Sequence, residues 1–247
     1  MTAPILEIRA LSVSFGGLRA VDEVSFEIAR NRITTVIGPN GAGKSTLFNL
    51  ISGALRPRHG QVLIEGLDYT GQPPYRMQAA GLARSFQITN LFFELSVSEN
   101  LRLAAQILEP LSMAWRPVHA SHLAQARVDE LLQRFSLADK AHYPAGKLSH
   151  GEQRRLEVAV ALACKPKILL LDEPTQGMSH GDTQETAALI KSLAADVTVL
   201  LIEHDIGLVM TLSDHVIVMH QGHKLAEGSP ADVRSNPAVQ AAYFGHA

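Results

Sequence analysis

The stretch "GPNGAGKST", residues 38–46, decides the fold. It fits the phosphate-binding pattern G-x-x-x-x-G-K-[ST]. In this pattern the glycines let backbone N–H groups turn toward phosphate oxygens, the lysine reaches the outer phosphates and the hydroxyl can ligate Mg²⁺. The alternative is an ordinary glycine-rich turn that only caps the next helix. We expect the whole stretch to bind a nucleotide, through Gly38, Pro39, Asn40, Gly41, Ala42, Gly43, Lys44, Ser45 and Thr46.

The residues on either side of this loop favour phosphate binding. Before it, "ILEIRALSVSF" (5–15) and "VDEVSFEI" (21–28) alternate between apolar and polar residues as strands do, and "ITTVIG" (33–38) is rich in β-branched residues. After it, "KSTLFNLISGAL" (44–55) has apolar residues at helical spacing, and "GQVLIEG" (60–66) returns to a strand. A strand, a glycine-rich loop and a helix therefore follow one another directly.

The middle of the chain has a mainly helical pattern, from Ser96 to about Ala163. Ser96 and Glu99 have the spacing of a capping box at a helix start. Two apolar stripes follow at helical spacing: Val128, Leu131, Leu132 and Phe135, and then Leu156, Ala159, Val160 and Ala163. We expect an inserted α-helical subdomain here.

Short apolar runs return after this stretch. "KILLLDEP" (167–174), "VTVLLIEHD" (197–205) and "HVIVMHQG" (215–222) are separated by helical patterns, which is typical of a parallel sheet covered on both faces. The ending "SPADVRSNPAVQAAYFG" (229–245) has a Ser-Pro helix start and predicts a last short helix.

These patterns predict an α/β fold in one domain, residues 1–247. Its P-loop NTPase core has a mostly parallel sheet and an N-terminal antiparallel β subdomain, and it takes in residues 1–93 and 164–247. The helical subdomain is expected over residues 94–163.

The composition excludes several classes of protein. The 247 residues include 22 Lys and Arg against 24 Asp and Glu, a formal net charge of −2, so general nucleic-acid binding is not indicated. No apolar run approaches the roughly 20 residues that cross a bilayer, and Glu7 and Arg9 interrupt the apolar N-terminus, which is therefore not a signal peptide. Cys164, in the apolar stretch "VAVALAC", favours a small buried side chain over a reactive thiol, in a reducing cytoplasmic setting. We expect a soluble protein that reaches a membrane only through partners.

Two adjacent carboxylates, Asp172 and Glu173, end the apolar run "ILLLDEPT" (168–175). Open α/β sheets place ligands at the carboxyl ends of their strands. We therefore expect Asp172 to bind Mg²⁺, generally through water, and Glu173 to be the base that activates the attacking water. A solvent-exposed strand end without chemistry is the alternative, and the nearby phosphate loop argues against it.

Two further polar side chains are candidates by their position. His204 follows the apolar run "VTVLLIE" (197–203) at the corresponding edge, where it can hydrogen-bond the terminal phosphate and help to hold the attacking water. Gln87 in "ARSFQ" (83–87) can reach the metal or the water, but by itself it reads as an ordinary surface glutamine.

An aromatic residue ends the first alternating run. Phe15 precedes two glycines, where an aromatic ring can stack on adenine with Val21 packing beside it. A core phenylalanine is the alternative, and spacing alone does not decide between the two.

Taken together in chain order, these pieces resemble the nucleotide-binding subunit of an ATP-binding cassette (ABC) transporter: Phe15, residues 38–46, Gln87, "LSHGE" (148–152), "LLLDEP" (169–174) and His204. The resemblance covers essentially the whole chain and implies ATP and Mg²⁺ as cofactors. It implies that Phe15 stacks on adenine and that Gln87 senses both Mg²⁺ and the membrane partner. Glu173 becomes the catalytic glutamate and His204 the switch histidine.

The stretch "LSHGEQRR" (148–155) looks like a helix start that receives an anion. The resemblance makes it the family signature. Ser149 and the backbone N–H of Gly151 then complete the site around an ATP held by the phosphate loop of a second ATPase subunit, either identical or a sister. The alternative is that the stretch only caps a helix in its own chain.

Further pieces are similar to the ATPases of branched-chain amino acid type importers: "FGGLRAV" (15–21), "LLIEHD" (200–205) and "NPAVQAAYFG" (236–245). That branch also serves urea, short amides and some aromatic acids. The resemblance implies two transmembrane permeases and an extracytoplasmic solute-binding protein as partners, with no nucleic acid. It implies a peripheral location on the cytoplasmic face of the inner (plasma) membrane.

The chain departs from the family pattern in two places. His150 and Glu152 occupy the third and fifth positions of a signature that commonly reads L-S-G-G-Q. After the glutamate, "QGMSH" (176–180) places Ser179 where a carboxylate or amide is usual.

Other functions share some of these motifs. An export ATPase for a lipid or glycolipid would share all of them. A structural or DNA-maintenance ATPase of the same superfamily would place long coiled coils between loop and signature, but residues 47–147 show no sustained heptads. A phosphoryl-transferring kinase would leave "LSHGE" without a role.

The segment 109–120, with the only tryptophan, Trp115, is either a permease-facing element or a packed loop of the helical subdomain.

Overall fold

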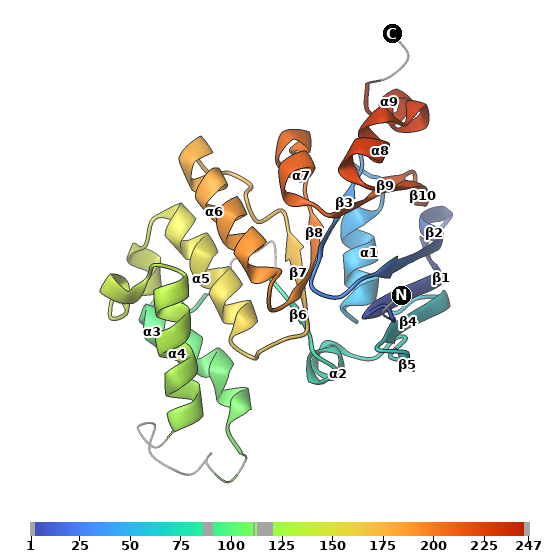
Figure 1. The fold of residues 1–247 in the computed structure, drawn as a ribbon. Helices are drawn as coiled ribbons and strands as arrows, with labels where there is room; N and C mark the ends of the chain where they lie inside the picture. Colours follow the sequence, from blue (N-terminus) through green and yellow to red (C-terminus); the bar gives the residue numbers. More distant parts are fainter. Residues whose placement is uncertain (1–2, 86–90, 111, 113–120, 245–247) are drawn as a thin grey trace.

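The computed structural model describes residues 3–85, 91–110, 112 and 121–244. Its centre is a six-stranded sheet in the order β10-β9-β3-β8-β7-β6 (Figure 1). The strands are β3 (Ile33–Ile37), β6 (Leu82–Arg84), β7 (Ile168–Asp172), β8 (Thr198–Ile202), β9 (His215–His220) and β10 (His223–Gly228). All neighbours pair in parallel except β10, which pairs antiparallel with β9. The carboxyl ends of the parallel strands therefore meet at one edge.

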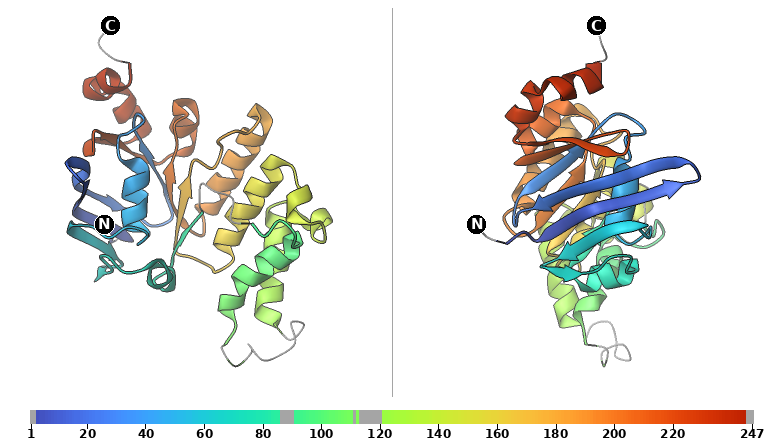
Figure 2. Two further views of the ribbon diagram at one scale, coloured as in Figure 1. Left: turned by 180° about the vertical axis from the view of Figure 1, so that it is seen from behind. Right: turned by 90° about the vertical axis from the view of Figure 1, so that its right-hand side faces the viewer.

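A second sheet, in the order β2-β1-β4-β5, is antiparallel. Its strands are β1 (Leu6–Phe15), β2 (Leu18–Ile28), β4 (His59–Ile64) and β5 (Leu67–Asp68). Helix α1 (Lys44–Ile51) packs between the two sheets, and the right-hand view of Figure 2 shows the antiparallel sheet in front of it. Fully buried Phe48 of α1 shares one core with Leu6 of β1 and Leu200 of β8.

Three helices form the part of the molecule farthest from the antiparallel sheet in Figure 1: α3 (Val97–Ala105), α4 (His122–Arg134) and α5 (His150–Leu162). Short 3₁₀ turns lie at Gln106–Leu108, Ala138–Lys140 and Ala145–Lys147. Leu131 of α4 and Leu156 of α5 are fully buried in a core that also contains Leu171 of β7. This core joins the helices to the parallel sheet.

The remaining helices are α2 (Pro74–Ala79), α6 (His180–Leu193), α7 (Ile206–Leu212), α8 (Pro230–Ser235) and α9 (Pro237–Phe244). Val209 of α7, Val216 of β9, Val233 of α8 and Val239 of α9 form a third, smaller core. The C-terminal helices are thus packed against the β9 side of the sheet.

The expected α/β architecture, with its parallel sheet, N-terminal antiparallel sheet and inserted helices, is confirmed. The subdomain boundaries near residues 94 and 163 stay a prediction. Helix α1 ends at Ile51 and does not reach Leu55, because Gly53 has a left-handed backbone (φ +75°). Ser96 caps α3 as expected, but the Glu99 carboxylate pairs with Arg102, so the capping box is half formed.

The lone cysteine behaves as the sequence indicated. Cys164 is partly buried beside the helical core, and burial raises the pKa of its thiol. A raised pKa keeps the thiol protonated and unreactive. None of the helices within the described ranges has both the length and the apolar character of a membrane span.

Candidate nucleotide site

The phosphate-binding loop connects β3 to α1 and leaves no room for side chains at two of its glycines. Gly43 is the N-cap of α1 with φ +97°, and a Cβ there would lie 2.2 Å from the carbonyl oxygen of Ala20 in β2. A Cβ on Gly38 would lie 2.3 Å from the carbonyl oxygen of Met219 in β9. Both contacts are far inside van der Waals distance, so the loop needs glycine at these positions for packing as well as for ligand approach.

Lys44 is held over the loop. Its Nζ donates hydrogen bonds to the carbonyl oxygens of Gly38 (2.7 Å) and Pro39 (3.1 Å), and the residue is buried. Burial lowers the pKa of Lys44, and the negative charges of Glu173 and Asp172 oppose that effect. The lysine and the two carboxylates therefore lie close enough to interact, although more than 120 residues separate them in the chain.

Asp172 ends β7 and is buried, with 1% of its surface exposed. Its Oδ2 accepts a hydrogen bond from Arg84 (3.0 Å), which also donates to Asn49 Oδ1 (2.6 Å) and Ser52 Oγ (3.0 Å) of the α1 segment. The other oxygen, Oδ1, is buried and finds no hydrogen-bond partner within the described residues. A buried carboxylate oxygen without a partner is costly, and a cation or its bound water would satisfy it. The donor set of Asp172 and the exposed Ser45 hydroxyl fits Mg²⁺, which prefers oxygen ligands.

Glu173 has a left-handed backbone (φ +47°) where the chain leaves β7. Its N–H donates to the Ile202 carbonyl of β8 (3.0 Å). From α5, the buried Arg154 donates to the carbonyl oxygens of Asp172 (2.8 Å), Glu173 (2.9 Å) and Pro174 (3.2 Å). The backbone that carries the carboxylate is therefore fixed from two sides, while the side chain itself is only half-buried. No local sequence signal marks Arg154, because its role depends on a contact between α5 and the end of β7.

His204 lies at the end of β8, as expected, with an exposed side chain. It follows Glu203, which is fully buried and which no local sequence signal marks either. The parallel register pairs Asp172 with Ile202, so Glu173 and His204 come from neighbouring strand ends.

The signature residues begin α5. Ser149 is the N-cap, and its Oγ accepts from the Glu152 N–H (3.3 Å), while Glu152 accepts from the Ser149 N–H (2.9 Å). Gly151 is buried, and a Cβ there would lie 3.1 Å from the Asp182 carboxylate of α6. The stretch thus caps its own helix, and the Ser149 hydroxyl still has its proton to donate.

Ser179, the residue that departs from the family pattern, is the N-cap of α6. Its Oγ accepts from the Asp182 N–H (3.3 Å) and donates to Asp182 Oδ2 (2.6 Å). Its hydroxyl is engaged inside its own chain. Helix capping therefore explains why a serine stands at this position.

Phe15 and Val21 differ in exposure. Phe15 ends β1 at a hairpin tip with 52% of its surface exposed, so its ring is accessible for stacking. Val21 is 1% exposed and pairs with Val13 inside the antiparallel sheet. Its side chain belongs to the core beside β1 and β2 and so supports the hairpin that carries Phe15. Ala20, its neighbour, touches the phosphate loop at Gly43.

Gln87 lies outside the described residues. So do Trp115 and most of the segment 109–120.

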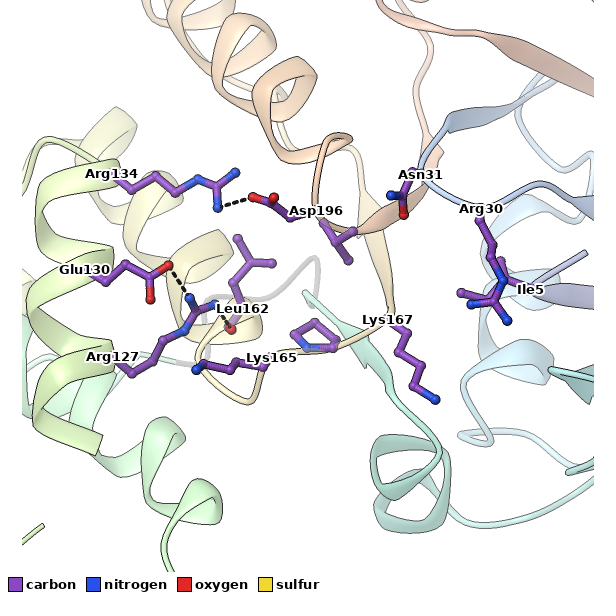
Figure 3. Close-up of a pocket in the computed structure, with 12 residues that line it drawn as sticks. Ile5, Arg30, Asn31, Arg127, Glu130, Arg134, Leu162, Lys165, Lys167 and Asp196 are labelled. Atoms are coloured by element: carbon purple, nitrogen blue, oxygen red, sulfur yellow. Dashed lines mark hydrogen bonds and ion pairs between the residues drawn. The ribbon is translucent and has the colours of Figure 1, made fainter. Parts of the chain in front are cut away.

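A hollow of about 500 Å³ lies at the opposite edge of the sheet, where the parallel strands begin (Figure 3). The two arginines of the helical part that line this hollow already have hydrogen-bond or ion-pair partners. Arg127 donates to Glu130 (2.6 Å) and to the Leu162 carbonyl (2.6 Å) at the end of α5, and Arg134 pairs with Asp196 (2.8 Å). None of the residues proposed to bind nucleotide lines it.

Comparison with known proteins agrees with this geometry. The family described as "ABC transporter" matches residues 21–176, and the family described as "Branched-chain amino acid ATP-binding cassette transporter" matches residues 223–247. The chain is 39% identical to the high-affinity branched-chain amino acid transport ATP-binding protein BraF of Pseudomonas aeruginosa, over the full length of both.

Many solved structures share the fold, and two of them are informative here. One is the ADP conformation of an ATP-binding cassette of an ABC transporter, with a TM-score of 0.86 and 32% identity, covering 99% of this chain and all of that one. The other is the dimeric, post-hydrolysis state of an ATP-binding cassette bound to ADP and phosphate, with a TM-score of 0.75 and 25% identity, covering 91% of this chain and 98% of that one.

Proposed function

The chain belongs to the ABC transporter family and is an ATPase of that family, and from this premise we propose that it powers the import of a branched-chain amino acid or a related small polar solute. The observation that carries the proposal is the match of residues 223–247 to the branched-chain amino acid family. The phosphate loop and carboxylates are common to importers and exporters, whereas this C-terminal segment matches a family described for branched-chain amino acid transporters. The match therefore favours import over the export of a lipid or glycolipid.

The phosphate loop binds the nucleotide. The backbone N–H groups available within residues 38–46, which exclude Pro39, contact the phosphates. Lys44 exchanges its two loop carbonyls for the outer phosphate oxygens. Phe15 stacks on adenine, supported by Val21 in the core. The loop and this hairpin are held together by the contact between Gly43 and Ala20.

Ser45, Asp172 and Gln87 are the residues that would hold Mg²⁺. When bound there, the ion would supply positive charge against the phosphates. The unpaired Oδ1 of Asp172 supports this assignment.

Glu173 takes a proton from the attacking water. Arg154 and the Ile202 carbonyl hold the backbone of Glu173 in place, so the position from which its carboxylate extends is fixed. His204 hydrogen-bonds the terminal phosphate and keeps the water in line.

The signature of one subunit completes the site of the other. Ser149 and the Gly151 N–H, at the positive end of α5, contact the terminal phosphate of an ATP held by residues 38–46 of a second ATPase subunit, identical or a sister. ATP therefore joins two chains and ADP does not, because only the terminal phosphate spans the gap.

The dimer acts on membrane partners. These are two transmembrane permeases on the cytoplasmic face of the inner membrane and an extracytoplasmic solute-binding protein. Residues 94–163 form the subdomain that carries the signature, and Gln87 links the nucleotide site to the permease.

Uptake by whole cells tests this function. Deleting the gene should lower uptake of labelled leucine, isoleucine or valine at least about 10-fold. Expressing the wild-type protein should restore uptake. Expressing the Glu173→Gln variant should not, because transport needs hydrolysis. Unchanged uptake of all three in the deletion strain, although the purified wild-type protein hydrolyses ATP, would contradict import of branched-chain amino acids.

A further inference from the structure

Glu203 is a fully buried carboxylate for which the proposed mechanism has no role. It follows the last residue of β8, and 0% of its surface is exposed. Glutamate is almost never fully buried unless its oxygens have partners. The partners that Glu203 has in this structure are therefore informative.

One oxygen of Glu203 holds the turn after the proposed base. Oε1 accepts two hydrogen bonds from Thr175, one from its hydroxyl (2.6 Å) and one from its N–H (3.3 Å). Thr175 is itself buried and comes two residues after Glu173. The short hydroxyl contact is typical of a charged acceptor.

The other oxygen holds the histidine segment. Oε2 accepts from the backbone N–H of His204 (3.2 Å), and it lies 3.8 Å from the His204 Nδ1. The imidazole is exposed. The carboxylate thus fixes the backbone of His204 and also faces one ring nitrogen.

These contacts continue the sheet beyond its last backbone bond. The β7–β8 ladder pairs Asp172 with Ile202, and the Glu173 N–H makes one more bond to the Ile202 carbonyl. Beyond that bond, two hydrogen bonds join Thr175 of one segment to the Glu203 carboxylate of the other.

We propose that Glu203 is a positioning residue that holds Glu173 and His204 at a fixed separation by bonding Thr175 with one oxygen and His204 with the other. This rests on the proposed roles of Glu173 and His204. Glu203 is fully buried and both its oxygens are bonded to protein groups, so in this proposal it sets geometry and takes no part in proton transfer. A misplaced reacting group costs rate even when binding is intact.

The amide variant separates this role from packing. Glu203→Gln keeps the shape but has one acceptor oxygen, and its NH₂ cannot accept from the His204 N–H. We expect kcat for ATP hydrolysis to fall about 10- to 100-fold, with KM for ATP within about twofold of wild type. Thr175→Val, which removes the hydroxyl donor, should have the same signature, and Thr175→Ser should restore kcat to within about threefold.

A buried threonine of β3 provides a matched control for the Thr175→Val variant. Thr35 in β3 is fully buried, and its Oγ1 makes a 2.6 Å hydrogen bond to Ser213 Oγ away from the reacting groups. Thr35→Val should lower the melting temperature as Thr175→Val does and leave kcat unchanged.

Steady-state kinetics and thermal melts of these variants decide the matter. Loss of kcat in Glu203→Gln and Thr175→Val but not in Thr35→Val supports the proposal. A kcat within twofold of wild type in the folded Glu203→Gln and Thr175→Val variants, or an equal loss in Thr35→Val, overturns it. If Glu203→Gln does not fold, the Thr175 pair decides. Failure of the proposed role of Glu173, on which this inference rests, is a different result: Glu173→Gln would then retain turnover.

Discussion

Glu173→Gln is expected to lower kcat for ATP hydrolysis about 1,000-fold while ATP affinity stays within about threefold of wild type. A positioned general base contributes roughly 10²- to 10⁴-fold to a rate. The amide keeps the shape of the carboxylate but cannot take the proton. The backbone of Glu173 is held by Arg154 and Ile202, and these bonds do not involve the altered group. An ATP-loaded, closed dimer should therefore accumulate.

The measurement pairs steady-state phosphate release with an ATP-binding titration on the same preparation. Glu185→Gln serves as the control, because Glu185 is a highly exposed glutamate of α6 whose charge pairs with Arg155. That variant should hydrolyse ATP at nearly the wild-type rate. Near-normal turnover in Glu173→Gln would remove Glu173 from its role.

Lys44→Ala is expected to weaken ATP binding about 100-fold. Hydrogen bonds to charged groups are worth about 1.5–3 kcal/mol each, and the lysine is aimed into the loop by its bonds to Gly38 and Pro39. Its ammonium is buried, so the interaction with a phosphate is little screened by solvent. Alanine also removes the cation that faces Asp172 and Glu173.

Titration with a fluorescent ATP analogue measures the effect. Lys191→Ala, which removes an exposed lysine of α6, is the control and should bind as wild type does. Unchanged affinity in Lys44→Ala would refute the assignment of the phosphate loop.

Much of this fold could be predicted from local sequence signals. The glycine loop between a β-branched run and a helical pattern is a local signal, and the structure places it between β3 and α1. Short, weakly patterned elements could not be predicted this way. Strand β10 is only partly buried and α7 has seven residues, so neither has enough apolar periodicity to stand out.

The site shows the same limit. Asp172, Glu173 and His204 stand next to apolar strands and could be selected from the sequence. Arg154 and Glu203 could not, because their partners lie 18 to 28 residues away and meet them only after the strands pair. The burial of Val21 depends likewise on the register between β1 and β2.

A disulfide test across subunits examines the central claim, that each ATP is shared between the loop of one chain and the signature of another. Cys164→Ala removes the only native cysteine, and Asn40→Cys with Ser149→Cys is added in the Glu173→Gln background. A disulfide requires Cα atoms within about 7 Å. With mild oxidant, a covalent dimer should appear on a denaturing gel with ATP and be nearly absent without it, between identical chains or between this chain and a sister ATPase that carries the matching cysteine. A crosslink formed only within one chain, or no dimer in either pairing, would contradict the account.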